Sequence, residues 1–235
     1  ASLLVRTPHG AVFALDPFGY IDRFVIEAGF YESEVLDALL THLRPGAVLW
    51  DIGANFGLHA VSAARLVPAA TVVAFEPNPA EHARLLQHRA WNAPHLIASS
   101  LALSNAAGVL PLHLGPAGNS GMTTLGAWAA PTAQGTVLVS VAAGDDLIAR
   151  GAVPAPTVIK LDVEGHEADV LTGLRQSLAH PRCECVVFED GTDDDTPAKQ
   201  TLRATGFNVS PLGRHEATSH PLQNFVARKS APLRP

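Results

Sequence analysis

The stretch Val48-Leu-Trp-Asp-Ile-Gly-Ala-Asn-Phe-Gly-Leu-His59 decides the fold of this 235-residue chain. Its apolar start, 48–50, is too short for a helix and predicts a strand buried on both faces. Asp51 stands where that strand should end, and the run 58–66 has helical periodicity. The turn between strand and helix contains Gly53, Asn55 and Gly57. Unpaired N–H groups at the helix start then lie beside the carboxyl end of a strand, where open α/β sheets bind ligands.

A second strand and a second carboxylate follow one unit later. Residues 71–75 form another short apolar run, and Glu76 stands directly after it, followed by Pro77-Asn78-Pro79. An acidic residue about 20 positions beyond a glycine-rich first turn is placed to bind the two hydroxyl groups of a ribose. The spacing from Gly53 to Glu76 therefore predicts a nucleoside site. The dinucleotide fingerprint G-x-G-x-x-G is absent, which argues against the alternative of an NAD-dependent oxidoreductase.

Charged residues alternate along a third predicted strand at 158–163. Lys160, Asp162 and Glu164 occur at every second position and are expected to share one face. Burying three charges is costly unless they pair with each other or reach an open cleft. One structural explanation is a Lys160–Asp162 ion pair, followed by acids at a helix start. We favour a functional edge, because parallel strands end on the same side and the earlier carboxylates stand there too.

Composition excludes several functional classes. The chain has 22 acidic and 16 basic residues, a net charge of −6, and no Lys/Arg cluster, so nucleic-acid binding is not favoured. No run of ~18 apolar residues indicates a membrane span. Cys183 and Cys185 are expected to pack in the core, on one face of a strand, rather than to form a disulfide or a zinc site. This cysteine usage is compatible with a reducing compartment, and we expect a cytoplasmic protein.

The periodicity elsewhere predicts a single α/β domain over residues 1–235. Residues 1–25 predict a small N-terminal β-hairpin, and residues 26–235 a catalytic core. Two alternating segments, 109–114 and 136–141, predict an inserted β-excursion. The count gives a Rossmann-like, seven-stranded, mostly parallel sheet with helices on both faces. Further strands are expected at 96–103, 184–189, 207–210 and 224–227, and helices at 33–43 (Ser33 as N-cap), 80–92, 145–148, 167–178 and 198–205 (Thr196 as N-cap).

Five motifs in this order resemble the FkbM family of class I S-adenosylmethionine-dependent methyltransferases. They are D-I-G-A-N-x-G from Asp51, F-E-P-N-P from Phe75, A-L-S from Ala102, N-x-G from Asn119 and K-x-D-x-E-G-x-E from Lys160. The last is the most distinctive. The resemblance covers roughly residues 26–190 and leaves both ends of the chain, where substrate choice is expected, without a matching motif.

The resemblance implies which residues bind the donor, S-adenosylmethionine. They are Asp51, Gly53, Asn55 and Gly57 on the methionine and ribose side, Glu76 at the ribose hydroxyls, Asn78 and Ala102 at the adenine, Asp162 near the reacting centre, and Glu32, from a G-x-Y-E element, as a cover. Asn119, in the N-x-G motif, and Glu189, at the end of a strand on the functional edge, are candidate substrate-binding residues.

The implied reaction is methyl transfer to a hydroxyl of a sugar or a polyketide-type natural product. An amide or amine nitrogen, including that of a peptide natural product, is the alternative acceptor. The donor is already activated, so the protein must align two reactants and remove one proton, which an alcohol yields only to a base. His166 is the candidate base by residue type, with Asp162 and Glu164 as rivals. Three intact carboxylates, Asp51, Glu76 and Asp162, argue against a non-catalytic cofactor-binding domain.

Convergent carboxylates at this edge leave a divalent metal as an open alternative, but no His/Asp spacing requires one, and no metal ligand is predicted. The acidic run with Asp190, Asp193, Asp194 and Asp195 lacks the spacing of an EF-hand and is interpreted as a solvated loop. His215 and His220 do not form H-E-x-x-H, and we discard them as a zinc site.

Overall fold

The central sheet of this protein, seen in a computed structural model that describes residues 2–126, 133–213 and 222–229, has seven strands. Their order is β11-β12-β10-β9-β3-β4-β5, and β12 runs antiparallel to both of its neighbours. The strands are β3 (Val48–Ile52), β4 (Thr71–Phe75), β5 (Ile97–Ser99), β9 (Val158–Leu161), β10 (Cys185–Gly191), β11 (Phe207–Pro211) and β12 (Leu222–Lys229). The predicted seven-stranded, mostly parallel sheet is confirmed.

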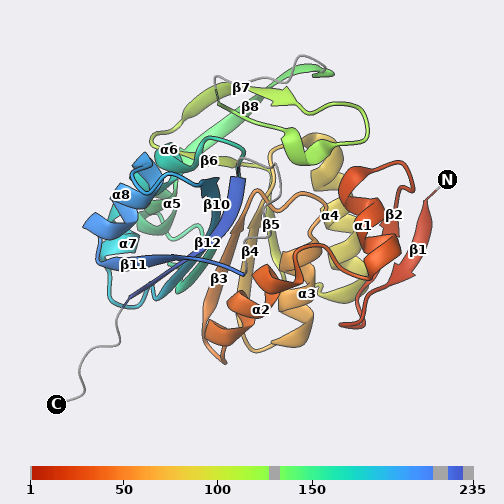
Figure 1. The fold of residues 1–235 in the computed structure, drawn as a ribbon, viewed down its shortest axis with the longest axis horizontal. Helices are drawn as coiled ribbons and strands as arrows, with labels where there is room; N and C mark the ends of the chain where they lie inside the picture. Colours follow the sequence, from red (N-terminus) through yellow and green to blue (C-terminus); the bar gives the residue numbers. More distant parts are fainter. Residues whose placement is uncertain (1, 127–132, 214–221, 230–235) are drawn as a thin grey trace.

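Helices cover both faces of this sheet because its strands are apolar on both sides (Figure 1). Leu49 and Val72 pack with α2 (Ser33–His42), α3 (Leu58–Leu66) and α4 (Pro79–Asn92). Their neighbours in sequence, Trp50 and Val73, point to the opposite core. The helices on that side are α5 (Gly144–Ala149), α6 (Glu167–Thr172), α7 (Arg175–Ala179) and α8 (Pro197–Ala204). Among the described residues, no helix has the length and apolar character needed to cross a membrane.

The N-terminal segment packs against α4. Its antiparallel hairpin, β1 (Leu3–Arg6) and β2 (Val12–Leu15), is as predicted, but it is followed by a helix that was not predicted, α1 (Tyr20–Ala28). His88 on α4 accepts a hydrogen bond from the Ala14 N–H at 3.0 Å and lies 2.8 Å from the carbonyl oxygen of Phe56. Arg84, also on α4, pairs with Asp22 of α1. These contacts fix α1 beside the carboxyl edge of the sheet.

The inserted β-excursion is confirmed and forms a separate sheet of order β6-β8-β7. Its elements are β6 (Ala102–Ser104), β7 (Gly108–Leu114), the short 3-10 helix η1 (Ser120–Met122) and β8 (Gly135–Ala143). Figure 1 shows this sheet arching over one edge of the central sheet. The arch therefore roofs the edge to which the sequence motifs were assigned.

Two predicted elements are broken, and both breaks involve β6. The expected strand 96–103 divides into β5 and β6, because the chain leaves the central sheet after Ser99 and β6 pairs with β8 instead. The expected helix 167–178 is interrupted after α6 at Gly173, where a Cβ would lie 2.0 Å from the Ser104 carbonyl oxygen. The predicted helix is therefore interrupted at the point where its backbone contacts β6.

Three smaller predictions were also wrong. Ser33 is the first residue of α2, and the N-cap is Glu32 in a left-handed conformation (φ 53°). Strand β9 ends at Leu161, so Glu164, with φ 54°, does not share a strand face with Lys160. The two cysteines are buried as expected, but Cys183 packs in one core and Cys185 in the other.

Candidate active site

A cavity of about 490 Å³ opens at the carboxyl edge of the central sheet. Its floor comes from the ends of β3, β4 and β9, and its walls from α1, the turn before α2 and the loop around η1. Ten of the sequence-predicted site residues line it: Glu32, Gly53, Asn55, Glu76, Ala102, Asn119, Asp162, Glu164, His166 and Glu189. The structure thus brings together residues that are up to 157 positions apart in the chain (from Glu32 to Glu189).

The turn after β3 contains left-handed backbone conformations, which glycine and asparagine adopt more readily than other residues. Gly53 has φ 81°, and a Cβ there would lie 1.8 Å from the Asp162 carbonyl oxygen. Asn55 is also left-handed, with φ 52°, and its side chain accepts a hydrogen bond from the Phe56 N–H. Gly57 (φ 90°) is the N-cap of α3 and packs on Leu85 rather than lining the cavity. The turn after β3 therefore packs against the backbone that follows β9.

Glu76 joins this turn to the next one. Its Oε2 accepts the Asn55 N–H and its Oε1 accepts the Asn78 N–H, both at 2.7 Å. The side chain is buried, and burial raises the pKa of Glu76 to about 8 although both N–H groups act in the opposite direction. Asn78 itself caps α4 through the Ala80 N–H and does not line the cavity, so its side chain is committed to the helix start.

Lys160 lies between two carboxylates beneath the cavity. Its Nζ is 3.0 Å from Asp162 Oδ2 and 3.6 Å from Asp51 Oδ1. Burial alone would lower the pKa of Lys160, but Asp162 and Asp51 raise it, so the ammonium stays charged. Asp51 is fully buried and does not line the cavity, and its burial raises its pKa against the effect of Lys160. The predicted Lys160–Asp162 pair exists, and it lies within the site.

Asp162 of this pair also belongs to a cluster of three carboxylates. Oxygen atoms of Asp162, Glu164 and Glu189 lie within 4.8 Å of one another, close enough to share a cation. Burial, together with the charge of Asp162, raises the pKa of Glu164 to about 8 and that of Glu189 to about 9. Acidic side chains often lie this close without a metal, and the cluster alone does not establish a metal site. It does make this part of the cavity strongly acidic.

Glu32 is the acid on the N-terminal wall. Its Oε1 accepts a hydrogen bond from the Asn224 side chain of β12 at 3.1 Å, and its carbonyl oxygen lies 3.3 Å from His59 Nε2. Burial and Asp162 raise the pKa of Glu32 to about 7. Glu32 therefore adds a further acidic side chain to the cavity lining, near enough to the three clustered carboxylates to affect their charge.

His166 lines the cavity with both of its ring nitrogens engaged. Nε2 lies 3.0 Å from Ser104 Oγ, and Nδ1 lies 3.4 Å from Asp169 Oδ2. The ring is buried, and this burial lowers the pKa of His166. The imidazole links α6 to β6, and it would have to leave these partners to accept a proton from a substrate.

The loop around η1 contributes the roof. Ser120 Oγ lies 3.3 Å from Asn55 Nδ2, and the Tyr20 N–H donates to the Gly118 carbonyl oxygen. Sequence reasoning missed Tyr20 and Met122 as lining residues, since α1 was not predicted and no motif marks Met122. Tyr31 and His59 also line the cavity. Both lie in stretches that the sequence analysis singled out, the G-x-Y-E element and residues 48–59, but neither was assigned a role there. The discarded pair His215 and His220 lies outside the described residues.

Comparison with known proteins identifies the family of this chain. A family model described as the methyltransferase FkbM domain matches residues 51–209. The chain is 32% identical to the hexuronic acid methyltransferase AglP of Haloferax volcanii, over 79% of this chain and 74% of that protein. It is 31% identical to the 31-O-demethyl-FK506 methyltransferase FkbM of Streptomyces tacrolimicus, over 87% of this chain and 88% of that protein.

Solved structures share the fold at low sequence identity. A precorrin-6y C5,15-methyltransferase of Geobacter metallireducens has a TM-score of 0.50 and 16% identity, over 84% of this chain and 87% of that chain. A precorrin 8w decarboxylase of Methanobacterium thermoautotrophicum has a TM-score of 0.51 and 13% identity, over 96% and 100%. Matched over most of its length by the family model and by both relatives, the chain belongs to the FkbM family of S-adenosylmethionine-dependent methyltransferases.

Proposed function

We propose that this enzyme transfers a methyl group from S-adenosylmethionine to a hydroxyl of a sugar or a polyketide-type natural product. The observation that carries the proposal is the acidic cavity, in which a nucleoside-type turn lies beside a cluster of carboxylates. The named relatives, which act on a hexuronic acid and on 31-O-demethyl-FK506, support a small-molecule acceptor. A nucleic-acid acceptor has no support in the net charge of −6.

The residues present fit the donor. Glu76 is a buried carboxylate at the cavity wall, placed after the second strand to bind ribose hydroxyls. Gly53 and Asn55 present backbone beside it, Ala102 offers a small apolar wall for the adenine, and Glu32 covers the opening. Asp51, Gly57 and Asn78 support the site without lining the cavity. Asp51 pairs with Lys160, Gly57 is the N-cap of α3, and Asn78 is the N-cap of α4. S-adenosylmethionine supplies a cationic sulfonium with an activated methyl group, and acidic walls suit that charge.

We assign the base to the carboxylate cluster, with Glu164 first and His166 as the rival. The Glu164 and Glu189 side chains accept no hydrogen bond from the part of the chain that the structure describes, whereas both His166 nitrogens are engaged. The positive sulfonium of bound S-adenosylmethionine would lower the pKa of nearby carboxyl groups. Glu164 would then be ionised and able to take the proton of the acceptor hydroxyl. Asp162, paired with Lys160, orients the cluster.

The second candidate is methyl transfer to an amine nitrogen, which the same acidic cluster favours because a protonated amine is attracted to it. Labelled methyl transfer from S-adenosylmethionine, measured for a panel of hydroxylated sugars, demethylated macrolides and their amino analogues, distinguishes the two. Transfer to amines and not to hydroxyls would refute O-methylation. Calorimetric titration should show binding of S-adenosylhomocysteine and none of NAD.

Variants then identify the base. Glu164→Gln should lower kcat about a hundredfold while S-adenosylhomocysteine affinity stays within threefold. His166→Ala should cost less than tenfold in kcat, because the ring serves to join α6 to β6. The opposite pattern, a hundredfold loss in His166→Ala and a small one in Glu164→Gln, would return the role of base to the histidine.

A further inference from the structure

The cavity has room for the donor and for little of the acceptor. Its volume of about 490 Å³ lies in the ~300–1,000 Å³ range in which proteins enclose one drug-sized ligand. S-adenosylmethionine is itself a ligand of that size. Only the reacting group of an acceptor therefore enters the cavity, and the body of the acceptor must lie against the mouth.

Three aromatic rings lead from the cavity wall to the surface. Tyr31 lines the cavity, Phe24 lies 5.5 Å from it, and Tyr20 lies 5.2 Å from Phe24, between ring centroids. Tyr20 lines the cavity and is still 43% exposed, which places it at the mouth. Phe24 is 39% exposed. The rings form a continuous row rather than the isolated exposed apolar residues that any surface carries.

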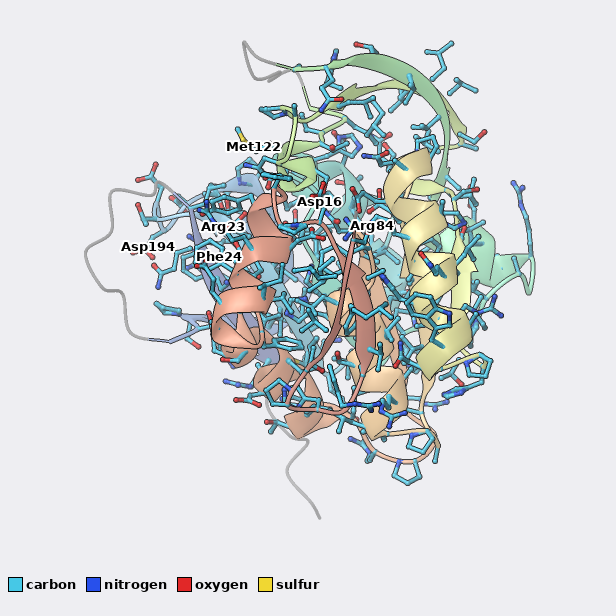
Figure 2. The ribbon with its side chains drawn as sticks, turned by 90° about the vertical axis from the view of Figure 1, so that its right-hand side faces the viewer. Asp16, Arg23, Phe24, Arg84, Met122 and Asp194 are labelled. Atoms are coloured by element: carbon cyan, nitrogen blue, oxygen red, sulfur yellow. The ribbon has the colours of Figure 1, made fainter. Side chains whose placement is uncertain are left out.

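This row stands on a rigid support. Tyr20 and Phe24 are four positions apart on α1 and so lie on one face of the helix. The other face carries buried Val25 and Asp22, which pairs with Arg84. Figure 2 shows Phe24 on the side of α1 away from Asp16 and Arg84, with Met122 of η1 toward the same side. The row lies before residues 51–209, the part of the chain that the family model matches.

We propose that Tyr20, Phe24 and Tyr31 form an acceptor subsite that binds a ring next to the group that is methylated. The inference rests on the proposed function and specifies its acceptor. Aromatic faces stack on the C–H face of a saturated ring, and the neighbouring carboxylates accept hydrogen bonds from its hydroxyl groups. The occupant is thus a hydroxylated, C–H-rich ring system, supplied either by a second sugar residue or by the macrocycle of a polyketide.

Calorimetry in the presence of saturating S-adenosylhomocysteine tests the subsite. The probes are glucuronic acid, a glucuronosyl-glucose disaccharide and a macrolide with a free ring hydroxyl. At least one larger probe should bind tenfold or more tightly than glucuronic acid, equivalent to about 1.4 kcal/mol. Phe24→Ala should remove that gain and leave glucuronic acid unaffected. A gain confined to the disaccharide assigns the ring to a sugar, and a gain confined to the macrolide assigns it to a polyketide.

Two controls make the outcome decisive. Trp91→Ala removes a ring that is 46% exposed on α4 and does not line the cavity, and it should change no probe affinity. Phe24→Leu keeps apolar volume without a ring face, so it reports on stacking if the alanine variant is unstable. Larger probes that bind no better than glucuronic acid, or equal losses in Phe24→Ala and Trp91→Ala, overturn the subsite. If wild-type protein fails to bind S-adenosylhomocysteine, the proposed function itself is refuted.

Discussion

Replacing Glu76 with alanine should damage the protein in two separable ways. The carboxylate accepts two backbone N–H groups at 2.7 Å each, that of partly buried Asn55 and that of buried Asn78. An unpaired buried donor costs about 1–3 kcal/mol, so the variant loses about 2–6 kcal/mol of stability. A free-energy change of 1 kcal/mol moves the midpoint by about 2–4 °C in a chain of this size. Differential scanning calorimetry should therefore show a fall of at least about 4 °C.

The second effect is on the donor. If the same carboxylate binds the ribose hydroxyls, Glu76→Ala should raise the Kd of S-adenosylhomocysteine at least tenfold, or about 1.4 kcal/mol. Titration well below the melting midpoint separates this effect from unfolding. A lowered midpoint with unchanged Kd would refute the ribose assignment and leave Glu76 as a link between two turns.

Asp145 provides a matched control for this experiment. Its carboxylate also accepts two backbone N–H groups, those of Gln176 at 2.7 Å and Ser177 at 3.0 Å, but it does not line the cavity. Asp145→Ala should lower the melting midpoint, by less because the site is more exposed, and should leave donor affinity unchanged. Equal losses of affinity in both variants would mean that stability alone determines binding.

Three further predictions follow from the geometry. Gly53→Ala should abolish measurable S-adenosylhomocysteine binding, because its Cβ would meet the Asp162 carbonyl oxygen at 1.8 Å, whereas Gly46→Ala, with the same φ of 81° and open space, should cost only about 1–2 kcal/mol of stability. The ligand-free protein should melt at least about 2 °C lower at pH 8.5 than at pH 6.5. The folded pKa values of about 8 for Glu164 and about 9 for Glu189 exceed the unfolded one, so stability is lost as pH rises through this window; a midpoint that rises instead contradicts the assignment. EDTA should leave methyl transfer within twofold, and a loss restored by Mg²⁺ would assign the carboxylate cluster to a metal.

The sheet was predictable because its signals are local. The strands β3, β4 and β9 are short, mostly apolar runs, each followed by a turn or a charged residue, and this pattern can be recognised without knowledge of the neighbouring strands. The failures occur where tertiary contact overrides local preference. Gly173 interrupts a helix because the Ser104 backbone lies against it, and β6 leaves the central sheet to pair with β8. Gly173 is the only local signal of the first break, and the pairing of β6 with β8 has no local signal near Ser99.

The candidate site also contains residues that local sequence signals predicted and residues that they did not. Residues fixed by backbone demands, such as Gly53 and Glu76, were found from spacing. Tyr20 was missed, because α1 begins after Gly19 without a side-chain cap and its polar and apolar residues suggested only turns. The role of His166 was inferred from residue type, which says nothing about Ser104 and Asp169 as its partners. Sequence spacing places groups at an edge of a sheet, whereas the direction of each side chain depends on packing.

The carboxylates around Lys160 repel one another in the ligand-free protein, and the same negative charge suits a cationic ligand. Five acids, Glu32, Asp51, Asp162, Glu164 and Glu189, surround one lysine, so the ligand-free site is short of positive charge. A cationic donor relieves that repulsion, but the product of methyl transfer is a neutral thioether and does not. In the proposed reaction, these carboxylates therefore regain their affinity for a proton once the methyl group has been transferred. If Glu164 is the base, as we propose, its proton affinity rises as the donor loses its charge, so it retains the proton it has taken. The repulsion in the ligand-free site then favours exchange of the product for a new donor.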